Sequence, residues 1–237
     1  ENALTVIRGI TLGSEDEIQQ LDKTITTLAS NTRVNMLSAA QAAGELARAG
    51  IDIKDQVNGA LEAVLNLSIA SAGELGLERA AVLTGSALKA FNLTGEDAAR
   101  VVNAITVAAQ NSAITFVDLQ RSFQQAAPVA SLLGLTVEDL AAAIGVLGEQ
   151  GIRGSDAGTA LKQAFQQLVK PSKQGLEAME KFGISLFDVA GKARPFRDLI
   201  IDLENAFSDE AIAINGTTEA QRANALATIF GSDAIRA

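Results

Sequence analysis

The sequence contains no cysteine, histidine, tryptophan or tyrosine, and only three prolines occur among its 237 residues. Without cysteine there is no disulfide and no thiolate metal site, so a reducing compartment is permitted. Without histidine the chain lacks the commonest general base and the commonest transition-metal ligand. Without tryptophan and tyrosine it lacks the best platforms for stacking nucleotide bases. These absences argue against most classes of enzyme and nucleotide-binding protein.

Motifs for catalysis are missing as well. No GxxxxGK[ST] phosphate-binding loop and no Gly-x-Ser-x-Gly nucleophile elbow is present. Adjacent acids at residues 96–97 and 138–139 could bind a hard cation, but both pairs fall in expected first helical turns, where the helix dipole favours acids. Three lysines around Pro171 could form an anion site, although no arginine pair or Gly-rich cradle accompanies them. We therefore predict no enzyme activity, no cofactor and no metal.

The charge of the chain is negative and uneven. The formal net charge is −9, which argues against a specific nucleic-acid partner. Residues 153–197, however, contain eight Lys or Arg and four Asp or Glu, so the local net charge is +4. This basic region could meet an acidic partner or could be the solvated face of two helices.

The chain is rich in apolar residues, but few of them are aromatic. Hydrophobic residues make up 48% of the chain and aromatic residues 4%. Ala, Leu, Ile and Val therefore dominate, which favours closely packed helices. Mean hydropathy is +0.20, and we expect another subunit or further chain to cover some apolar surface. No signal peptide and no uninterrupted apolar run of membrane-spanning length is visible.

A local pattern recurs along the chain. A small or capping residue is followed by Ile or Leu, and an acid stands four positions later. Three copies place a threonine before a helix and an acid three residues on: Thr94 with Asp97, Thr115 with Asp118, and Thr136 with Asp139. This is the pattern of a capping box, which satisfies the first free N–H groups of a helix. Over the full set of copies the spacing is uneven, so we predict an all-α array of short, tightly capped helices without a fixed period. The apolar residues of these copies are Ile51, Leu93, Ile114, Leu135, Ile152 and Ile184.

The expected elements follow from this pattern and from apolar spacing. Helices are expected over residues 14–29, 34–49, 54–72, 74–91, 95–111, 116–132, 137–149, 155–169, 172–182 and 195–207. A last helix is expected from a cap at Thr217 or Thr218 through Ile229. We expect a break at Pro128 in the helix over 116–132. Residues 184–196 differ, because Leu186, Phe187 and Val189 stand around a turn at Gly191. This stretch predicts a short β-hairpin or an extended loop.

The segment 151–184 holds the densest set of backbone signals. Gly151 can end one helix in the left-handed conformation, and Gly183 can end another. Gly154 and Gly158, one helical turn apart, permit close packing of helices in a soluble bundle or in a membrane. Pro171 separates the two helices of the segment. Because the segment contains no catalytic side chain, we predict that its role is packing.

The order of several short motifs resembles the core region of phage tail tape-measure proteins. The motifs are ELARAGI (45–51), AFNLTGEDA (90–98), QAAPVA (125–130), GIRGSDAGTAL (151–161), KPS (170–172), GISLFD (183–188) and IFG (229–231). The resemblance covers residues 36–235, and the run 151–161 followed by KPS is its most specific part.

The resemblance implies a structural role. A tape-measure protein is a long, largely helical chain inside the tail tube, where its length sets the length of the tube during assembly. It contacts tube proteins and tail-tip or baseplate proteins, and it leaves the tube before the DNA passes. Several copies lie together, often with threefold symmetry. The resemblance therefore implies assembly in the bacterial host cytoplasm and localisation in the virion tail.

Two alternatives of other classes stay open. A membrane-active or channel-forming segment, meeting the host membrane after ejection, fits the small-residue pairs and the high hydropathy, but charges occur on nearly every expected helix. A cell-wall hydrolase would need an acid in a cleft-like setting, and the sequence shows none.

The chain is expected to have three parts. We expect a lead-in helix over 1–33 that ends a longer upstream segment. A helical tape-measure core over 34–194 and C-terminal helices over 195–237 that continue into further chain would follow.

Overall fold

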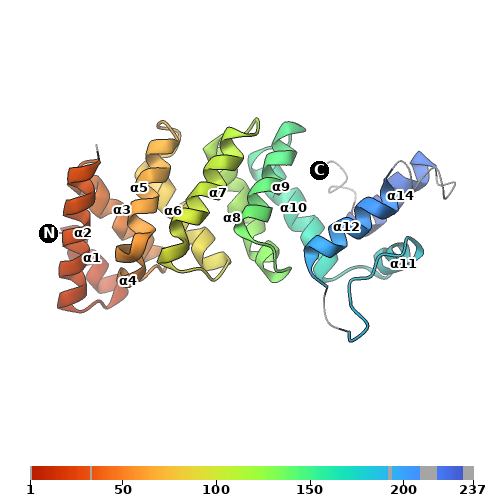
Figure 1. Cartoon of the computed structure of the whole chain (residues 1–237), viewed down its shortest axis with the longest axis horizontal. Helices are drawn as coiled ribbons and strands as arrows, with labels where there is room; N and C mark the ends of the chain where they lie inside the picture. The colour runs from red at the N-terminus through yellow and green to blue at the C-terminus, as the bar shows by residue number, and fades with distance from the viewer. Residues whose placement is uncertain (1, 33, 192–193, 209–217, 232–237) are drawn as a thin grey trace.

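The computed structural model describes residues 2–32, 34–191, 194–208 and 218–231. All regular elements in these ranges are helices, which confirms the all-α prediction. Figure 1 shows α1 to α10 side by side in an elongated array, with α11, α12 and α14 at the end opposite the N-terminus.

The element bounds agree closely with expectation for most of the chain. The elements are α1 (Asn2–Thr11), α2 (Glu15–Asn31), α3 (Met36–Arg48), α4 (Ile53–Asp55), the π-helix η1 (Gln56–Ala60), α5 (Leu61–Ala70), α6 (Leu77–Ala90), the 3₁₀-helix η2 (Gly95–Asp97), α7 (Ala98–Gln110), α8 (Phe116–Leu132), α9 (Val137–Glu149), α10 (Gly154–Val169), α11 (Lys173–Lys181), α12 (Phe196–Phe207) and α14 (Glu219–Phe230). Ser14 and Glu17 form a capping box at the start of α2.

The array has two layers of helices. In one layer α3, α6, α8 and α10 pack successively, and in the other α5, α7 and α9 do so. Consecutive helices form antiparallel hairpins between the layers, as in helical solenoids. Each hairpin buries its apolar faces against its neighbours on both sides, so the stack forms one continuous core.

The turns into one layer recur with a fixed interval. Ile51, Leu93 and Leu135 stand 42 residues apart and precede α4, η2 and α9 respectively. The residue before each is left-handed, with φ of 82° at Gly50, 53° at Asn92 and 74° at Gly134. The N–H groups of the three apolar residues donate to the carbonyls of Leu46, Leu88 and Ala130 at 2.9, 2.8 and 3.2 Å. This interval applies to one set of turns only, because Ile114, Ile152 and Ile184, the copies between them and after them, stand 38 and 32 residues apart. The whole series is therefore unevenly spaced as expected, but the set that recurs every 42 residues was not predicted.

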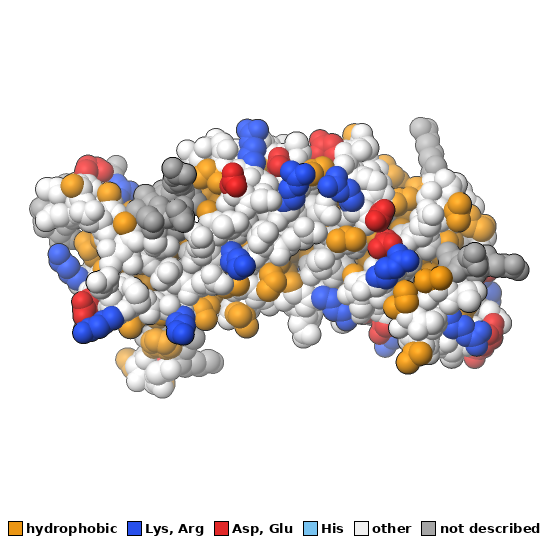
Figure 2. All heavy atoms as spheres, turned by 180° about the vertical axis from the view of Figure 1, so that it is seen from behind, with side chains coloured by type: hydrophobic (Ala, Val, Ile, Leu, Met, Phe, Trp, Pro, Cys, Tyr) orange, Lys and Arg blue, Asp and Glu red, His pale blue; other side chains and the backbone are white. Residues whose placement is uncertain are grey.

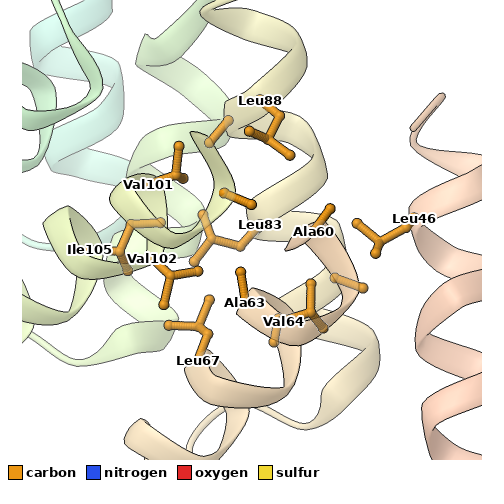
Figure 3. Packing of buried hydrophobic residues seen from close by; sticks show 14 of the residues in the cluster. Leu46, Ala60, Ala63, Val64, Leu67, Leu83, Leu88, Val101, Val102 and Ile105 are labelled. Atoms are coloured by element: carbon orange, nitrogen blue, oxygen red, sulfur yellow. The ribbon is translucent and has the colours of Figure 1, made fainter. Parts of the chain in front are cut away.

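Two hydrophobic clusters hold the structure together. The main cluster runs through the array from Ile7 to Phe165 and includes many alanines. Figure 3 shows Ala63 of α5, Leu83 of α6 and Val102 of α7 within this cluster. A second cluster joins the end of α10 to the C-terminal helices: Leu168, Met179, Ile184, Leu186, Leu199, Phe207, Ala225 and Ile229. Each large buried aliphatic side chain contributes about 1.5–3 kcal/mol relative to exposure.

The β-hairpin expected near residues 184–196 is wrong, since the described residues of that stretch contain no strand. Among its described residues a single backbone bond crosses the stretch, from the Arg194 N–H to the Leu186 carbonyl at 3.0 Å, and local side-chain bonds occupy other backbone groups. The Asp188 carboxylate accepts from the Ala190 N–H at 2.9 Å, and the Ser185 hydroxyl donates to the Phe187 carbonyl at 2.7 Å. Such bonds compete with the ladder of a hairpin. Residues 192 and 193 lie outside the described residues.

Two expected helices also differ from the structure. The helix expected over 54–72 is interrupted at Gly59, whose φ is 129°. A Cβ at Gly59 would lie 3.1 Å from the Gly95 carbonyl oxygen. The backbones of η1 and η2 therefore lie in close contact at this point, with no room for a side chain between them. The expected break at Pro128 is absent, because α8 continues through it. The carbonyl that the proline leaves without a helical partner belongs to the exposed Gln124, where water can satisfy it.

Candidate functional site: the α8–α10 contact

Gly151 and Gly183 end helices in the left-handed conformation. Their φ angles are 83° and 71°. The Gly151 N–H donates to the Gly148 carbonyl at 3.1 Å, and the next N–H, of Ile152, donates to Leu147 at 2.9 Å. The same pair of bonds follows α11 at Gly183. This arrangement pairs the last carbonyls of the helix and turns the chain sharply.

Gly154 and Gly158 lie where α10 contacts α8. A Cβ at Gly158 would be 2.8 Å from the Ser122 Cα, from the Ser122 carbonyl oxygen and from the Gln125 Cβ. Gly154 has φ of 58°, and a Cβ there would be 3.0 Å from Asp118 Oδ1. Because two of these neighbours are backbone atoms, only glycine permits this approach of α10 to α8.

Ser122 links the two helices by a hydrogen bond. It is fully buried, and its hydroxyl lies 2.7 Å from the Gly154 carbonyl oxygen and 2.9 Å from the Asp118 carbonyl oxygen. Sequence reasoning missed this residue. The available signal was the helical spacing of Leu119, Ser122 and Ala126, which places this serine on the buried face of α8.

Pro171 lies between α10 and α11 and separates them. Lys170 before it has left the helical conformation, and Ser172 after it caps α11 by accepting from the Gly175 N–H at 2.9 Å. The lysines flanking this turn do not converge with Lys162, which is two helical turns or about 12 Å away along α10. The anion site considered from the sequence therefore has no common focus.

The threonine–aspartate pairs stand at three separate helix starts. The Thr115 hydroxyl accepts from the Asp118 N–H at 3.0 Å, and the Thr136 hydroxyl accepts from the Asp139 N–H at 3.1 Å. The Thr94 N–H donates to Asp97 Oδ2 at 3.1 Å at the start of η2. These six residues begin η2, α8 and α9, so the structure does not bring them together into one site.

Carboxylates from one repeat also cap helices of the next. Asp55 Oδ1 accepts from the Gly95 N–H at 2.9 Å, and Glu74 Oε2 accepts from the Phe116 N–H at 2.8 Å. A backbone N–H without a partner in the first turn of a helix forms its strongest hydrogen bonds with a charged acceptor. Sequence reasoning missed these contacts, since they join residues about 40 positions apart. The Asn58-Gly59 pair, which favours a turn, was the one local signal of the kink beside Asp55.

A small charge network joins α7 to α9. Arg100 Nη1 contacts Glu138 Oε1 at 2.8 Å, and Arg100 Nη2 contacts Asp97 Oδ1 at 3.4 Å. The hydrogen bond from the Thr94 backbone N–H, followed by the Arg100 guanidinium, lowers the pKa of Asp97. The hydrogen bond to Glu138 raises the pKa of Arg100. The network holds two stacked repeats together at their surface.

A cleft of about 670 Å³ lies between α9, α10, α12 and α14. Its lining is mostly apolar and includes Leu135, Val146, Phe165 and Phe230. On the face drawn in Figure 2, hydrophobic side chains are scattered along the array among charges of both signs. The cleft is larger than the pocket between α7 and α9, of about 350 Å³, and the pocket beside α11, of about 510 Å³.

The described residues contain neither a metal-binding cluster nor a membrane-spanning helix. No group of three or more Asp or Glu side chains is placed to hold a metal ion in the part of the chain that the structure covers. None of the described helices combines the length and the apolar character needed to cross a membrane.

Comparison with known proteins gave one family and two curated relatives. The family model described as phage-related minor tail protein matches residues 22–231. A tape measure protein of Pneumococcus phage Dp-1 is 29% identical over 97% of this chain and 19% of its own length. A probable tape measure protein of Escherichia phage P2 is 30% identical over 93% of this chain and 26% of its own length.

The extent of these matches differs between the chain and its relatives. The chain spans about a fifth and a quarter of the lengths of the two curated relatives. No solved structure gives a significant match. The family model, by contrast, matches far more than half of the chain. The chain therefore belongs to the family of phage-related minor tail proteins.

Proposed function

We propose that this chain is a region of a phage tail tape-measure protein, which sets the length of the tail tube during assembly and takes part in genome delivery. The observation that carries the proposal is the alignment of 97% and 93% of the chain with two proteins so named. The helical array agrees with the largely helical character expected for such a protein.

The helical array is a compact block and is not the extended segment that would set the tail length. A continuous α-helix advances about 1.5 Å per residue, so a chain used as a ruler is long and extended. Here the longest helices have 17 residues, about 25 Å, and each is followed by a turn that reverses the chain. We infer that the length-setting segment lies elsewhere in the full protein and that this block positions one part of it.

The partners of the block are other tail proteins. Under the proposal it meets tail-tube and tail-tip or baseplate proteins and further copies of itself, with threefold symmetry, in the virion tail after assembly in the host cytoplasm. Exposed apolar side chains support the proposal that partners cover parts of this surface. Leu12 is 88% exposed and Leu132 is 76% exposed. The division of the chain at residues 33 and 194 stays a prediction.

The role is proposed to be non-catalytic. The residues singled out from the sequence cap helices and permit close packing, and none forms a nucleophile–base pair. No specific contact favours a membrane-active segment or a cell-wall hydrolase, so neither is proposed as a second function.

The proposal is tested by deleting residues 151–184 within the full-length protein in a producing phage. The deletion removes α10, α11 and the α8–α10 contact, and we expect tail assembly to abort. The control is Gly44→Ala, at a helical position with nothing within 4 Å of the added Cβ, which should give normal tails. Normal tails from the deletion, seen by electron microscopy, would contradict a structural role for this segment.

A further inference from the structure

A groove of about 350 Å³ lies between α7 and α9, which pack side by side within the array (Figure 1). It involves neither the first nor the last helices of the chain. Val107 of α7 is 46% exposed and Val146 of α9 is 59% exposed beside it. The more buried part of the lining consists of small residues: Ala104, Ala108, Ala141 and Gly145. The groove therefore leaves space for bulky apolar side chains that the array itself does not supply.

Gly145 is a helical glycine that the packing of the array does not require. A Cβ at this position would have its nearest neighbour, Ser112 Oγ, at 3.5 Å, which is an ordinary contact. Gly148 in the same helix differs, because a Cβ there would overlap the side chain of Ile114. Glycine inside a helix costs about 1 kcal/mol relative to alanine. At Gly145 this cost enlarges the groove and has no explanation in the contacts within the array.

The polar side chains of the lining do not form a site for a small ligand. The Asn111 side-chain amide donates to the Val107 carbonyl at 2.9 Å, and the Ser112 hydroxyl donates to the Ala108 carbonyl. Small-molecule sites have a few polar groups that converge on the ligand, whereas these groups bond back to α7. An apolar groove between two helices instead suits the apolar face of a third helix.

The groove is acidic. Glu138 and Glu149 line it, and its described lining residues include no Lys or Arg. Arg100 Nη1 pairs with Glu138 at 2.8 Å. Glu149 has no ion pair in the described part of the chain, and Arg153, the next basic residue in the sequence, donates to the Gly148 carbonyl at 3.4 Å. Because α5, α7 and α9 together carry four acidic side chains and one basic side chain, the layer favours a cationic partner.

The helix dipoles add to this charge at one end of the groove. Helices α7 and α9 run in the same direction, because α8 reverses the chain between them. The last turns of both contain no basic residue. Two negative helix ends therefore lie at the Glu149 end of the groove. The positive N-terminus of a bound helix is favoured at that end.

We propose that the groove between α7 and α9 binds a basic amphipathic helix of another protein. Glu138 and Glu149 are 11 residues apart, about 16 Å along α9, so three turns of the partner fill the groove. Leucine-sized side chains of the partner pack over Gly145 and the alanines, and a Lys or Arg faces Glu149. The partner runs antiparallel to α7 and α9. The inference goes beyond the proposed function, since the groove and its charge do not depend on a role in length control.

Binding of a synthetic peptide tests the apolar part of the proposal. The probe is a labelled helix of about 18 residues, with leucines at i, i+3, i+4 and i+7 and lysines on both flanks. Fluorescence anisotropy measures its binding to the 237-residue chain. Val107→Glu should weaken binding at least about 10-fold, because it places a charge in the groove. Ile69→Glu, at a 55% exposed position of α5 outside the groove, should change binding less than about 2-fold.

Two results of this assay would overturn the proposal. One is an equal effect of Val107→Glu and Ile69→Glu, with helical circular dichroism spectra for both. The other is a loss of binding in Ile200→Glu, since Ile200 lines the larger cleft and not this groove.

Charge reversal tests the electrostatic part. Glu149→Lys should weaken binding of the lysine peptide at least about 5-fold at low ionic strength. Glu62→Lys in α5 makes the same change of net charge outside the groove and is the matched control. A peptide with glutamate in place of every lysine should bind at least about 10-fold more weakly than the lysine peptide. Equal effects of the two substitutions, or equal binding of the two peptides, would contradict a basic partner.

Photo-crosslinking in the full-length protein identifies the occupant in a producing phage. A photo-crosslinking amino acid replaces Asn103, which lines the groove, and Asn66 of α5 is the matched exposed control. During assembly and in finished tails, position 103 should crosslink to a segment of another protein with helical apolar spacing and an excess of Lys and Arg. A segment without that excess, a second copy of this chain, or no crosslink above the control would overturn the proposal. Tail length is read separately, so normal length control without the crosslink would leave the proposed function intact.

Discussion

Gly158→Ala tests whether the α8–α10 contact depends on the absence of a side chain. The added Cβ would lie 2.8 Å from the Ser122 Cα and from the Ser122 carbonyl oxygen. Ordinary contacts begin near 3.4 Å, so the two helices would have to separate by about 0.6 Å. Backbone atoms cannot rotate away as the end of a side chain can. The separation would also lengthen the bond from the Ser122 hydroxyl to the Gly154 carbonyl.

The expected magnitude follows from two opposing effects. Overpacking in a close contact costs about 1–3 kcal/mol. Replacing glycine by alanine in a helix stabilises the helix by about 1 kcal/mol. Gly44→Ala and Gly145→Ala isolate the second effect, because Gly44 has nothing within 4 Å of an added Cβ and Gly145 has its nearest neighbour at 3.5 Å. We expect both controls to be stabilised by up to about 1 kcal/mol and Gly158→Ala to lie about 1–3 kcal/mol below them.

Urea unfolding followed by circular dichroism measures the difference. With a slope of about 2 kcal/mol per M, Gly158→Ala should unfold about 0.5–1.5 M earlier than the two controls. A midpoint equal to that of Gly44→Ala would refute the reasoning, because it would show that α8 and α10 lie farther apart than the contact described here.

Three further predictions concern caps and charge. Thr136→Ala should lower the free energy of unfolding by about 1 kcal/mol, whereas Thr159→Ala, at an exposed position inside α10, should change it little; equal effects in urea unfolding would exclude the cap as the cause. Because the folded pKa of Asp97 lies below its ordinary value of 3.8, its contribution to stability is present above that value and is lost as the pH falls through the lowered pKa. Asp97→Asn should therefore weaken the acid dependence of thermal unfolding, and an unchanged pH profile would contradict this. Glu74→Ala should cost about 0.5–1.5 kcal/mol, since it removes the acceptor of the Phe116 N–H, and native-state hydrogen exchange should be faster at that amide; an unchanged exchange rate would count against the cap.

Local signals in the sequence were sufficient to predict most helices. Residues such as Thr115 and Thr136 act within three residues of themselves, so their capping pattern is legible without a structure. The bounds of α8 and α9 coincide with those expected. The 42-residue interval was also in the sequence, but it was hidden because copies belonging to two layers were read as one series.

Contacts between distant residues could not be predicted in the same way. Gly95 approaches Asp55 so closely that a Cβ would lie 2.0 Å from the Asp55 carbonyl oxygen. Neither residue indicates this by itself, since the contact depends on how two repeats stack. Ser122 is similar, because its position opposite Gly154 follows from the packing of α10 on α8. In the loop after α11, side-chain bonds from Ser185 and Asp188 outweighed the apolar pattern that favoured a hairpin.

Tail length, measured by electron microscopy, tests the central claim most directly. A deletion is made in an extended helical segment of the full-length protein, outside the 237-residue block described here. If the protein is a tape measure, the tail should shorten by about 1.5 Å for each residue removed, so a 70-residue deletion should shorten it by about 105 Å. Tails of unchanged length would contradict the account.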